Sequence, residues 1–181
     1  MKFTPLGIPD IIVISPEIIY DERGYFAEIF RQNEFENILN KKINFVQENE
    51  SKSAKNTLRG LHFQEEPFAQ SKLVKAVNGK VLDIAVDIRK ESKTFGKYVS
   101  YILDSNKKEQ IYIPRGFAHG FLVLSKSAII SYKVDNYYSP SHEKGFHYSD
   151  PLINIDWGNI DGSVITSHKD ANLPPFREIN F

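Results

Sequence analysis

The stretch Pro114-Arg115-Gly116-Phe117-Ala118-His119 connects two short apolar segments, 110–113 and 120–124. Both segments have the β-branched and aromatic composition of strands. Proline and glycine favour tight turns, so the stretch predicts a turn that delivers His119 to the start of the second strand. A protein built mainly from short β-strands is therefore expected.

Segments of the same kind recur on both sides of this turn. Their apolar runs and alternating patterns predict strands at 11–14, 25–30, 41–47, 58–64, 72–77, 80–89, 97–103 and 128–134. The dipeptide Asn78-Gly79 predicts a hairpin between two of them, and the polar segment 51–56 predicts a loop. One clear helix is expected in the first half, at 34–40, capped by Asn33. Many short strands and almost no helix indicate an all-β fold, either a β-sandwich or a small barrel such as a jelly roll.

The segment 80–89 alternates between two faces. One face carries Leu82, Ile84, Val86 and Ile88, and the other carries Asp83, Asp87 and Arg89. We expect the first face to be buried and the second to be more polar. From Ser139 onward prolines are frequent, which predicts loops and a short helix.

Length and composition bound the class of protein. With 181 residues the chain can form one domain with a substantial core, and we expect a single domain, 1–181. The 23 Lys and Arg residues balance the 23 Asp and Glu residues, so no net charge attracts nucleic acid or an anionic membrane, and any phosphate binding must be local. The absence of cysteine excludes disulfides and thiol chemistry. No apolar leader or bilayer-length run is present, so we expect a cytoplasmic protein.

The stretch 114–119 resembles the second sequence motif of the cupins. That resemblance favours a double-sheet jelly roll among the all-β folds. In metal-binding cupins the first motif offers two histidines one residue apart and a glutamate. Here the corresponding place has His62 followed by Gln64, so these two motifs cannot assemble a three-histidine site, and we expect no required metal.

A closer resemblance extends over nearly the whole length. The chain resembles the dTDP-4-dehydrorhamnose 3,5-epimerases, metal-free cupins that isomerise a nucleotide-linked 4-keto-6-deoxy sugar. The matching segments are 21–24, Phe26, Glu28, 47–49, 58–62, 70–74, 114–124, 132–133, 136–138 and 169–170. So many motifs in one order predict the family far better than any one of them does.

The chemistry of such a reaction can be compared with these residues independently. Epimerising C3 and C5 of a 4-keto sugar requires a base, a group that stabilises the enolate oxygen, and an acid on the opposite face of the ring. His62 suits the base, because a neutral imidazole titrates near working pH. The resemblance gives Asp170 the role of orienting that imidazole, Lys72 that of stabilising the enolate and Tyr132 that of the acid. Reversible deprotonation needs no redox cofactor, and we expect none.

The resemblance also assigns the binding of the nucleotide sugar. It implies that Arg23 and Arg59 contact the phosphates, that Tyr138 stacks on the thymine, and that Phe26, Glu28, Gln47 and Asn49 line the nucleotide pocket. His119 is expected near the substrate beside His62, with Glu143 and Lys169 as further substrate contacts. The segment 23–28 of this family crosses to a neighbouring subunit, which implies a homodimer with exchanged N-terminal segments.

Some details depart from a simple pattern. Strict alternation places Arg59 on the face opposite His62, so both can reach one site only if Gly60 carries a bulge or Arg59 begins the strand. The segment 145–148 differs from the family pattern. His142, His147 and His168 lie in loop-like segments and receive no role.

Other interpretations stay open at this point. His62 in an apolar strand and Tyr132, in phase with Ala128, Ile130 and Val134, are also compatible with packed core residues. Related reactions are epimerisation at C3 alone, or epimerisation of another nucleotide-linked 4-keto sugar such as a GDP-linked heptose. Different classes are a metal-dependent cupin using His62, Gln64 and His119, and a sugar-nucleotide-binding cupin without catalysis.

Overall fold

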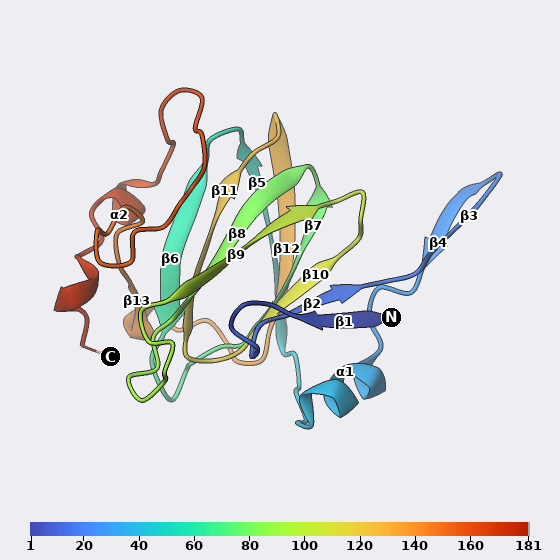
Figure 1. Ribbon diagram of the computed structural model, residues 1–181, viewed down its shortest axis with the longest axis horizontal. Helices are drawn as coiled ribbons and strands as arrows, with labels where there is room; N and C mark the ends of the chain where they lie inside the picture. Colours follow the sequence, from blue (N-terminus) through green and yellow to red (C-terminus); the bar gives the residue numbers. More distant parts are fainter. Residues whose placement is uncertain (181) are drawn as a thin grey trace.

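Two antiparallel β-sheets face each other in the computed structural model, which describes residues 1–180 (Figure 1). The first sheet has the strand order β1 (Lys2–Pro5), β2 (Ile12–Ser15), β10 (Gln110–Ile113), β7 (Lys72–Asn78), β12 (Ser127–Val134) and β5 (Gln47–Ala54). The second has the order β13 (Glu143–Gly145), β6 (Leu58–Gln64), β11 (Phe117–Val123), β8 (Lys80–Asp87) and β9 (Tyr98–Asp104). The expected all-β, double-sheet jelly roll is confirmed.

Apolar side chains from both sheets fill the space between them. The inner core includes Val74 of β7, Ala85 of β8, Phe121 of β11 and Ile130 of β12. Tyr132 packs at the edge of this core, in phase with Ile130, as the alternation of β12 predicts. Next to this inner core, polar residues of β7, β11 and β12 line a cavity that is described below.

Two segments cover the outer faces of the sheets. Helix α1 (Gln32–Leu39) buries Phe35 against the first sheet, where its ring meets the Tyr112 ring edge-on with centroids 5.1 Å apart. The C-terminal segment covers the second sheet with apolar residues such as Phe146 and Trp157. It contains two 3₁₀ turns, η1 (Pro140–His142) and η2 (Phe176–Glu178), and helix α2 (His168–Ala171), and it matches the expected loops and short helix. No helix within residues 1–180 is long and apolar enough to span a membrane.

Both faces of β8 are buried, which corrects the expectation of one polar outer face. Ile84 and Val86 face the C-terminal segment, while Asp83 and Asp87 point between the sheets and are both 0% exposed. Asp87 accepts hydrogen bonds from Arg89, Ser92 and Thr94, and these bonds outweigh burial and lower its pKa to about 2. The predicted alternation of β8 is correct. Its apolar face points away from the other sheet and is covered by the C-terminal segment, and its acidic face points between the sheets.

Two expectations about connections were wrong. The segment 51–54 belongs to β5 and pairs with β12, so only residues 55–56 form the turn. Asn78-Gly79 does not close a hairpin, because β7 belongs to the first sheet and β8 to the second. The chain crosses there from one sheet to the other.

The helix and one extended segment also differ from expectation. Helix α1 begins at Gln32, with Arg31 at the N-cap position, and Asn33 accepts a hydrogen bond from the Glu34 backbone instead of capping. Arg31 pairs with Glu28 and Glu34, which fixes the chain before the first turn. Residues 41–46 are irregular, and the strand begins at Gln47.

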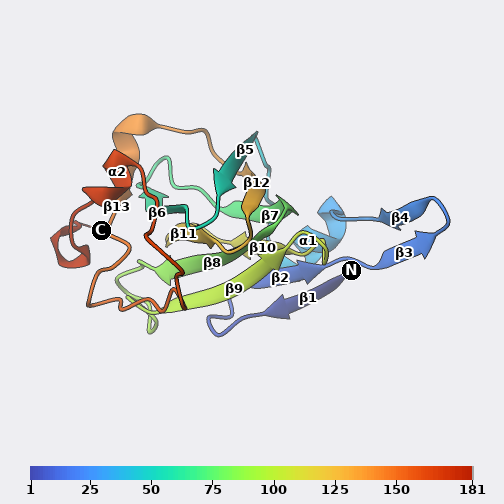
Figure 2. The same cartoon turned by 90° about the horizontal axis from the view of Figure 1, so that it is seen from above.

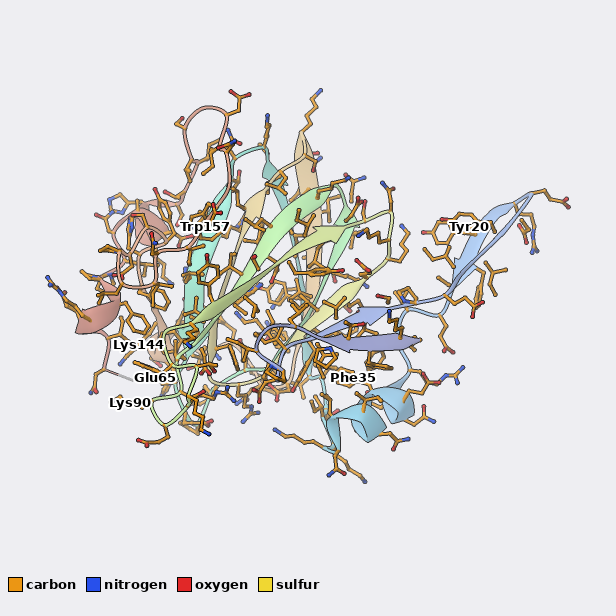
Figure 3. The ribbon with its side chains drawn as sticks, viewed as in Figure 1. Tyr20, Phe35, Glu65, Lys90, Lys144 and Trp157 are labelled. Carbon is orange, nitrogen blue, oxygen red and sulfur yellow. The ribbon has the colours of Figure 1, made fainter. Side chains whose placement is uncertain are left out.

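A β-hairpin projects away from the two sheets. Strands β3 (Ile18–Asp21) and β4 (Gly24–Ala27) pair only with each other among the described strands, and we call residues 18–28 the arm. Figure 2 shows the arm extending beyond the sheets in a second view, and Figure 3 shows Tyr20 on it, far from the body of the protein. Its apolar side chains are exposed, with Phe26 at 68% and Tyr20 at 70%.

Candidate active site

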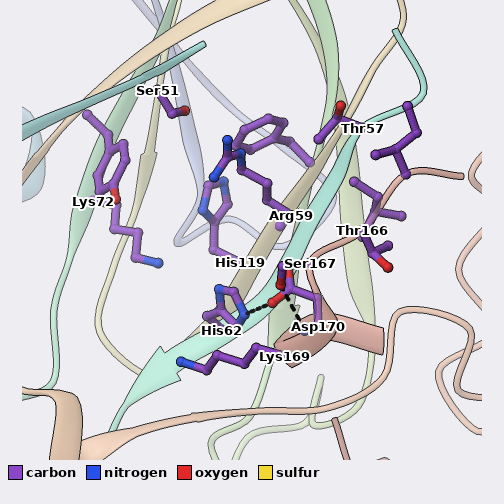
Figure 4. Close-up of a pocket in the computed structure, with 15 residues that line it drawn as sticks. Ser51, Thr57, Arg59, His62, Lys72, His119, Thr166, Ser167, Lys169 and Asp170 are labelled. Atoms are coloured by element: carbon purple, nitrogen blue, oxygen red, sulfur yellow. Dashed lines mark hydrogen bonds and ion pairs between the residues drawn. The ribbon is translucent and has the colours of Figure 1, made fainter. Parts of the chain in front are cut away.

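A cavity of about 440 Å³ opens between the two sheets, beside the C-terminal helix α2 (Figure 4). Strands β6 and β11 of the second sheet and β7 and β12 of the first contribute to its wall. Its lining includes all four residues expected to be catalytic, His62, Lys72, Tyr132 and Asp170, together with Arg59, His119 and Lys169. A smaller neighbouring cavity of about 90 Å³ shares His62, Lys72 and Tyr132 and adds Asn49, Tyr138 and Glu143.

His62 is hydrogen-bonded to Asp170, with 2.9 Å between Nε2 and Oδ1. Asp170 is buried in the short helix α2, whose N-cap Ser167 accepts a hydrogen bond from the Asp170 backbone. Burial opposes ionisation of Asp170, but hydrogen bonds from His62 and the Gly60 backbone lower its pKa below the usual value. An ionised carboxylate only accepts, so His62 donates through Nε2 and keeps the lone pair of Nδ1 free for a proton.

A bulge in β6 turns Arg59 and His62 to the same face. His62 lies opposite His119 and Arg59 lies opposite Phe121, so three residue steps on β6 match two on β11. Gly60, between them, has a φ of +115°, a conformation that other residues rarely adopt. Of the two arrangements that the sequence allowed, the structure has the bulge. Arg59 lines the cavity, and its Nε donates to Ser53 Oγ at 3.0 Å.

Lys72 and Tyr132 face His62 from the opposite sheet. Burial lowers the pKa of Lys72 to about 8, although the negative charges of Asp83 and Glu143 favour its protonated form. Burial raises the pKa of Tyr132, while the side chain of Asn49, its partner across β5 and β12, acts in the opposite direction. The phenol therefore stays protonated at neutral pH. The cavity brings together an imidazole on one wall and an ammonium group and a phenol on the other.

His119 lies beside His62 on the neighbouring strand and is bonded to a buried acid. Its Nε2 is 2.9 Å from Oδ2 of Asp83, whose side chain is fully buried. Sequence reasoning missed Asp83, because it took the acidic side of β8 for an outer face. Asp83 is in phase with Val81 and Ala85 of the inner core, but Ile84 and Val86 make the other face of β8 apolar as well, so the pattern alone does not say which face points inward.

Glu143 joins several of the expected binding residues at the edge of the cavity. Its Oε2 accepts a hydrogen bond from the Tyr138 hydroxyl at 2.7 Å and forms an ion pair with Lys169. Its Oε1 lies 4.0 Å from His62 Nδ1. Gln47 accepts a hydrogen bond from the Tyr138 backbone at 3.1 Å and donates one to Asn49 at 2.8 Å. These residues, expected along the nucleotide, therefore form one connected group.

Four expected binding residues line neither cavity: Gln47, which contacts Tyr138 at the edge, and three residues on the arm. Arg23 lies on the exposed arm and pairs with Asp21, Phe26 projects from the arm, and Glu28 pairs with Arg31. None of the three lines either cavity. Within residues 1–180, no group of three or more His, Cys, Asp or Glu side chains is placed to hold a metal ion.

The comparisons with known proteins agree with one another. The family model described as dTDP-4-dehydrorhamnose 3,5-epimerase matches residues 5–178. The dTDP-4-dehydrorhamnose 3,5-epimerase of Shigella flexneri is 49% identical over 181 residues, which cover 100% of this chain and 99% of that protein. The crystal structure of dTDP-4-dehydrorhamnose 3,5-epimerase from Elizabethkingia anophelis NUHP1 is similar with a TM-score of 0.95 and 44% identity, covering 100% of this chain and 99% of the other.

A further similar structure carries a ligand. It is that of dTDP-6-deoxy-D-glucose-3,5-epimerase from Legionella pneumophila Philadelphia 1 in complex with dTDP-4-keto-L-rhamnose, with a TM-score of 0.94 and 44% identity, covering 99% of this chain and 94% of that chain. The match to the family model spans almost the whole chain, and the relatives match it over nearly their full length. The protein belongs to the dTDP-4-dehydrorhamnose 3,5-epimerase family.

Proposed function

We propose that this protein epimerises dTDP-4-dehydro-6-deoxy-D-glucose at C3 and C5 to dTDP-4-dehydro-L-rhamnose, a step in dTDP-rhamnose biosynthesis. The observation that carries the proposal is the placement of the His62–Asp170 pair opposite Lys72 and Tyr132 across one cavity. The family to which the chain belongs and the dTDP-4-keto-L-rhamnose in the Legionella relative support it.

The two walls of the cavity suit removal and return of a proton on opposite faces of a sugar ring. His62 takes the proton from the carbon beside the ketone, and the bonding electrons move to the carbonyl oxygen to form an enolate. The ammonium group of Lys72 stabilises that oxygen, and Asp170 stabilises the imidazolium. Tyr132 then gives its hydroxyl proton to the carbon from the other wall. Each inversion leaves His62 protonated and Tyr132 ionised, so His62 passes its proton to solvent and Tyr132 takes one from solvent before the second carbon is inverted.

The connected group at the edge of the cavity suits the nucleotide. We assign Arg59 to the diphosphate and Tyr138, 51% exposed, to stacking on the thymine ring. Gln47, Asn49, Glu143 and Lys169 lie around Tyr138 and offer donors and acceptors to the rest of the nucleotide sugar, with His119 near the sugar.

We further propose a homodimer in which the arm of each subunit completes the site of the other. The arm exposes apolar side chains, and Arg23, Phe26 and Glu28 are remote from the cavity of their own chain. An exchanged arm would bury these apolar residues and bring Arg23 to the diphosphate of the neighbouring site. A diphosphate substrate does not cross bilayers, and we propose that the enzyme acts in the cytoplasm, where nucleotides are made.

The proposed function is tested by incubation with dTDP-4-keto-6-deoxyglucose in heavy water. Reversible deprotonation beside the ketone introduces deuterium at each carbon that the enzyme inverts, and NMR or mass spectrometry locates it. We expect deuterium at both C3 and C5. Incorporation at C3 alone would identify a single-centre epimerase, and no incorporation would reject this substrate.

A further inference from the structure

Strand β8 buries two carboxylates between the sheets, and their surroundings differ. Asp87 accepts hydrogen bonds at both oxygens, from Arg89, Ser92 and Thr94. Asp83 accepts one hydrogen bond, from His119 to Oδ2, and its Oδ1 has no hydrogen-bond partner among residues 1–180. A fully buried carboxylate with one free oxygen is unfavourable unless nearby positive charge offsets it. Asp83 therefore requires an explanation that Asp87 does not.

Lys72 is the cation of the cavity whose charge Asp83 stabilises. Asp83 attracts the Lys72 ammonium group and favours its protonated form, against the effect of burial. Asp83 affects the charge of Lys72 and the orientation of His119. Both of these residues line the cavity, whereas Asp83 itself does not. Asp83 lies behind the cavity wall and cannot be displaced by a ligand that enters the cavity.

Other charged and titratable groups also surround Lys72. They come from β6, β11, β12, β13, α2 and the segment before η1, and they are Arg59, His62, His119, Tyr132, Glu143, Lys169, Asp170 and Tyr138. Among the acids, Asp170 is bonded to His62 and Glu143 is bonded to Tyr138 and Lys169. Asp83 differs from both because it does not line the cavity and one of its oxygens has no hydrogen-bond partner within residues 1–180. His119 is the one side chain there that is bonded to it.

Resting on the proposed function, we propose that Asp83 is a positioning residue for the reaction, a permanent counter-ion that keeps Lys72 positively charged beneath the substrate and fixes the ring of His119. Since the Asp83 carboxylate only accepts, His119 donates to it through Nε2, and Nδ1 remains an acceptor at the cavity wall. Without Asp83, a smaller fraction of Lys72 would be protonated when the enolate oxygen forms. Asp83 thus acts through Lys72 and touches no reacting atom.

The test is Asp83→Asn, which keeps the shape of the side chain and removes its charge. Lys72 works as an ammonium group, so activity is lost as the pH rises through the pKa of Lys72, about 8 in the native protein. Removing a charge that raises this pKa moves the basic limb of the kcat profile to lower pH. We expect a shift of about one pH unit or more and a fall in kcat at pH 8 of about fivefold or more, with KM changed less than about threefold.

Asp87→Asn is the matched control. It makes the same substitution on the same buried face of β8, but its partners Arg89, Ser92 and Thr94 lie outside the cavity. We expect it to lower the thermal stability and to leave the basic limb in place. If Asp83→Asn and Asp87→Asn gave the same pH profile, the inference would be overturned.

A second measurement does not depend on turnover. NMR titration of ¹³C-labelled lysine gives the pKa of Lys72 directly, with Lys72→Arg to assign the signal. In the wild-type protein we expect Lys72 to be protonated at pH 7, and in Asp83→Asn we expect its pKa to be lower, while Asp83→Glu should restore most of it. A neutral Lys72 at pH 7 in the wild type would overturn the inference even if no Asp83 variant folded. Because no substrate is needed, this result also separates failure of the inference from failure of the proposed reaction.

Discussion

His62 has a carboxylate near each of its ring nitrogens. Asp170 is bonded to Nε2 at 2.9 Å, and Glu143 lies 4.0 Å from Nδ1. The closer acid fixes the tautomer, and the second is already engaged by Tyr138 and Lys169. Nδ1 therefore keeps its lone pair for the substrate.

The opposite positions of His62 and Tyr132 predict different failures when each is removed. His62→Ala should abolish both solvent deuterium exchange and turnover, because no base remains. Tyr132→Phe should still exchange an α-proton with solvent while losing completed inversion by about a hundredfold or more. The measurement is deuterium uptake by mass spectrometry beside product formation by NMR.

Tyr101→Phe is the control for Tyr132→Phe. It removes a tyrosine hydroxyl that donates to Glu109 at 2.8 Å on the far strand β9, outside the cavity. Full activity is expected. Full epimerisation by Tyr132→Phe would show that another group returns the proton.

At the scale of the element, the bulge in β6 decides whether the site exists. In a regular strand without the bulge, Arg59 and His62, three positions apart, would point to opposite faces. An added Cβ at Gly60 would lie 2.6 Å from Gly120 Cα and 2.7 Å from the His119 carbonyl oxygen. The neighbouring strand β11 thus leaves no room for a side chain at this position.

Gly60→Ala is therefore expected to destabilise the protein by about 3 kcal/mol or more, because the clash is with the backbone of β11 and the residue keeps a positive φ. Activity should fall as well, since Arg59 and His62 are displaced together. Gly158→Ala is the control: its φ is +73°, but no described atom lies within 4 Å of the added Cβ, so a loss of only about 1 kcal/mol is expected. Urea unfolding measures both. Equal losses would show that the bulge does not depend on close packing against β11.

The strands differ in how well the sequence predicted them. Apolar strands were predictable because their side chains are buried in alternation, as in β12. The segment 51–54 was not, because β5 is the last strand of its sheet and carries polar residues on both faces, exposed on one and directed to Arg59 and the cavity on the other. Asn78-Gly79 misled for another reason: a turn dipeptide does not specify whether the next strand pairs with the previous one, and β8 joined the other sheet.

The site was predictable to a similar degree. His62, Lys72, Tyr132 and Asp170 came from resemblance and chemistry, and the structure places them in one cavity. Asp83 stayed hidden because alternation separates the two faces of β8 without saying which one points inward. The positions of Arg23, Phe26 and Glu28 in a complete site depend on a second subunit, which one chain does not define.

At the scale of the whole molecule, the proposed exchange of arms predicts complementation between two inactive or impaired variants. His62→Ala lacks the base, and Arg23→Ala lacks a phosphate contact supplied by the arm. In a mixed dimer, the Arg23→Ala subunit keeps an intact His62 and receives an intact arm from its His62→Ala partner. One site of each mixed dimer should therefore regain nearly native activity.

The measurement is the activity of the two variants unfolded, mixed and refolded together, compared with each refolded alone. Phe35→Ala in place of Arg23→Ala is the control, because Phe35 of α1 packs against the first sheet of its own subunit and no exchange of arms can restore it. If mixing Arg23→Ala with His62→Ala restored nothing while mixed dimers formed, the arm would serve its own subunit.

The pairing of distant strands has a consequence during synthesis. Strand β5, at residues 47–54, pairs with β12, at residues 127–134, and β6 is bordered by β11 and β13 from the second half. A nascent chain therefore leaves the ribosome with β5 and β6 unpaired, and neither sheet can close until β12 and β13 emerge. Such non-local pairing slows folding and exposes strand edges in the meantime. We expect the growing polypeptide to depend on chaperones until its last third has been translated.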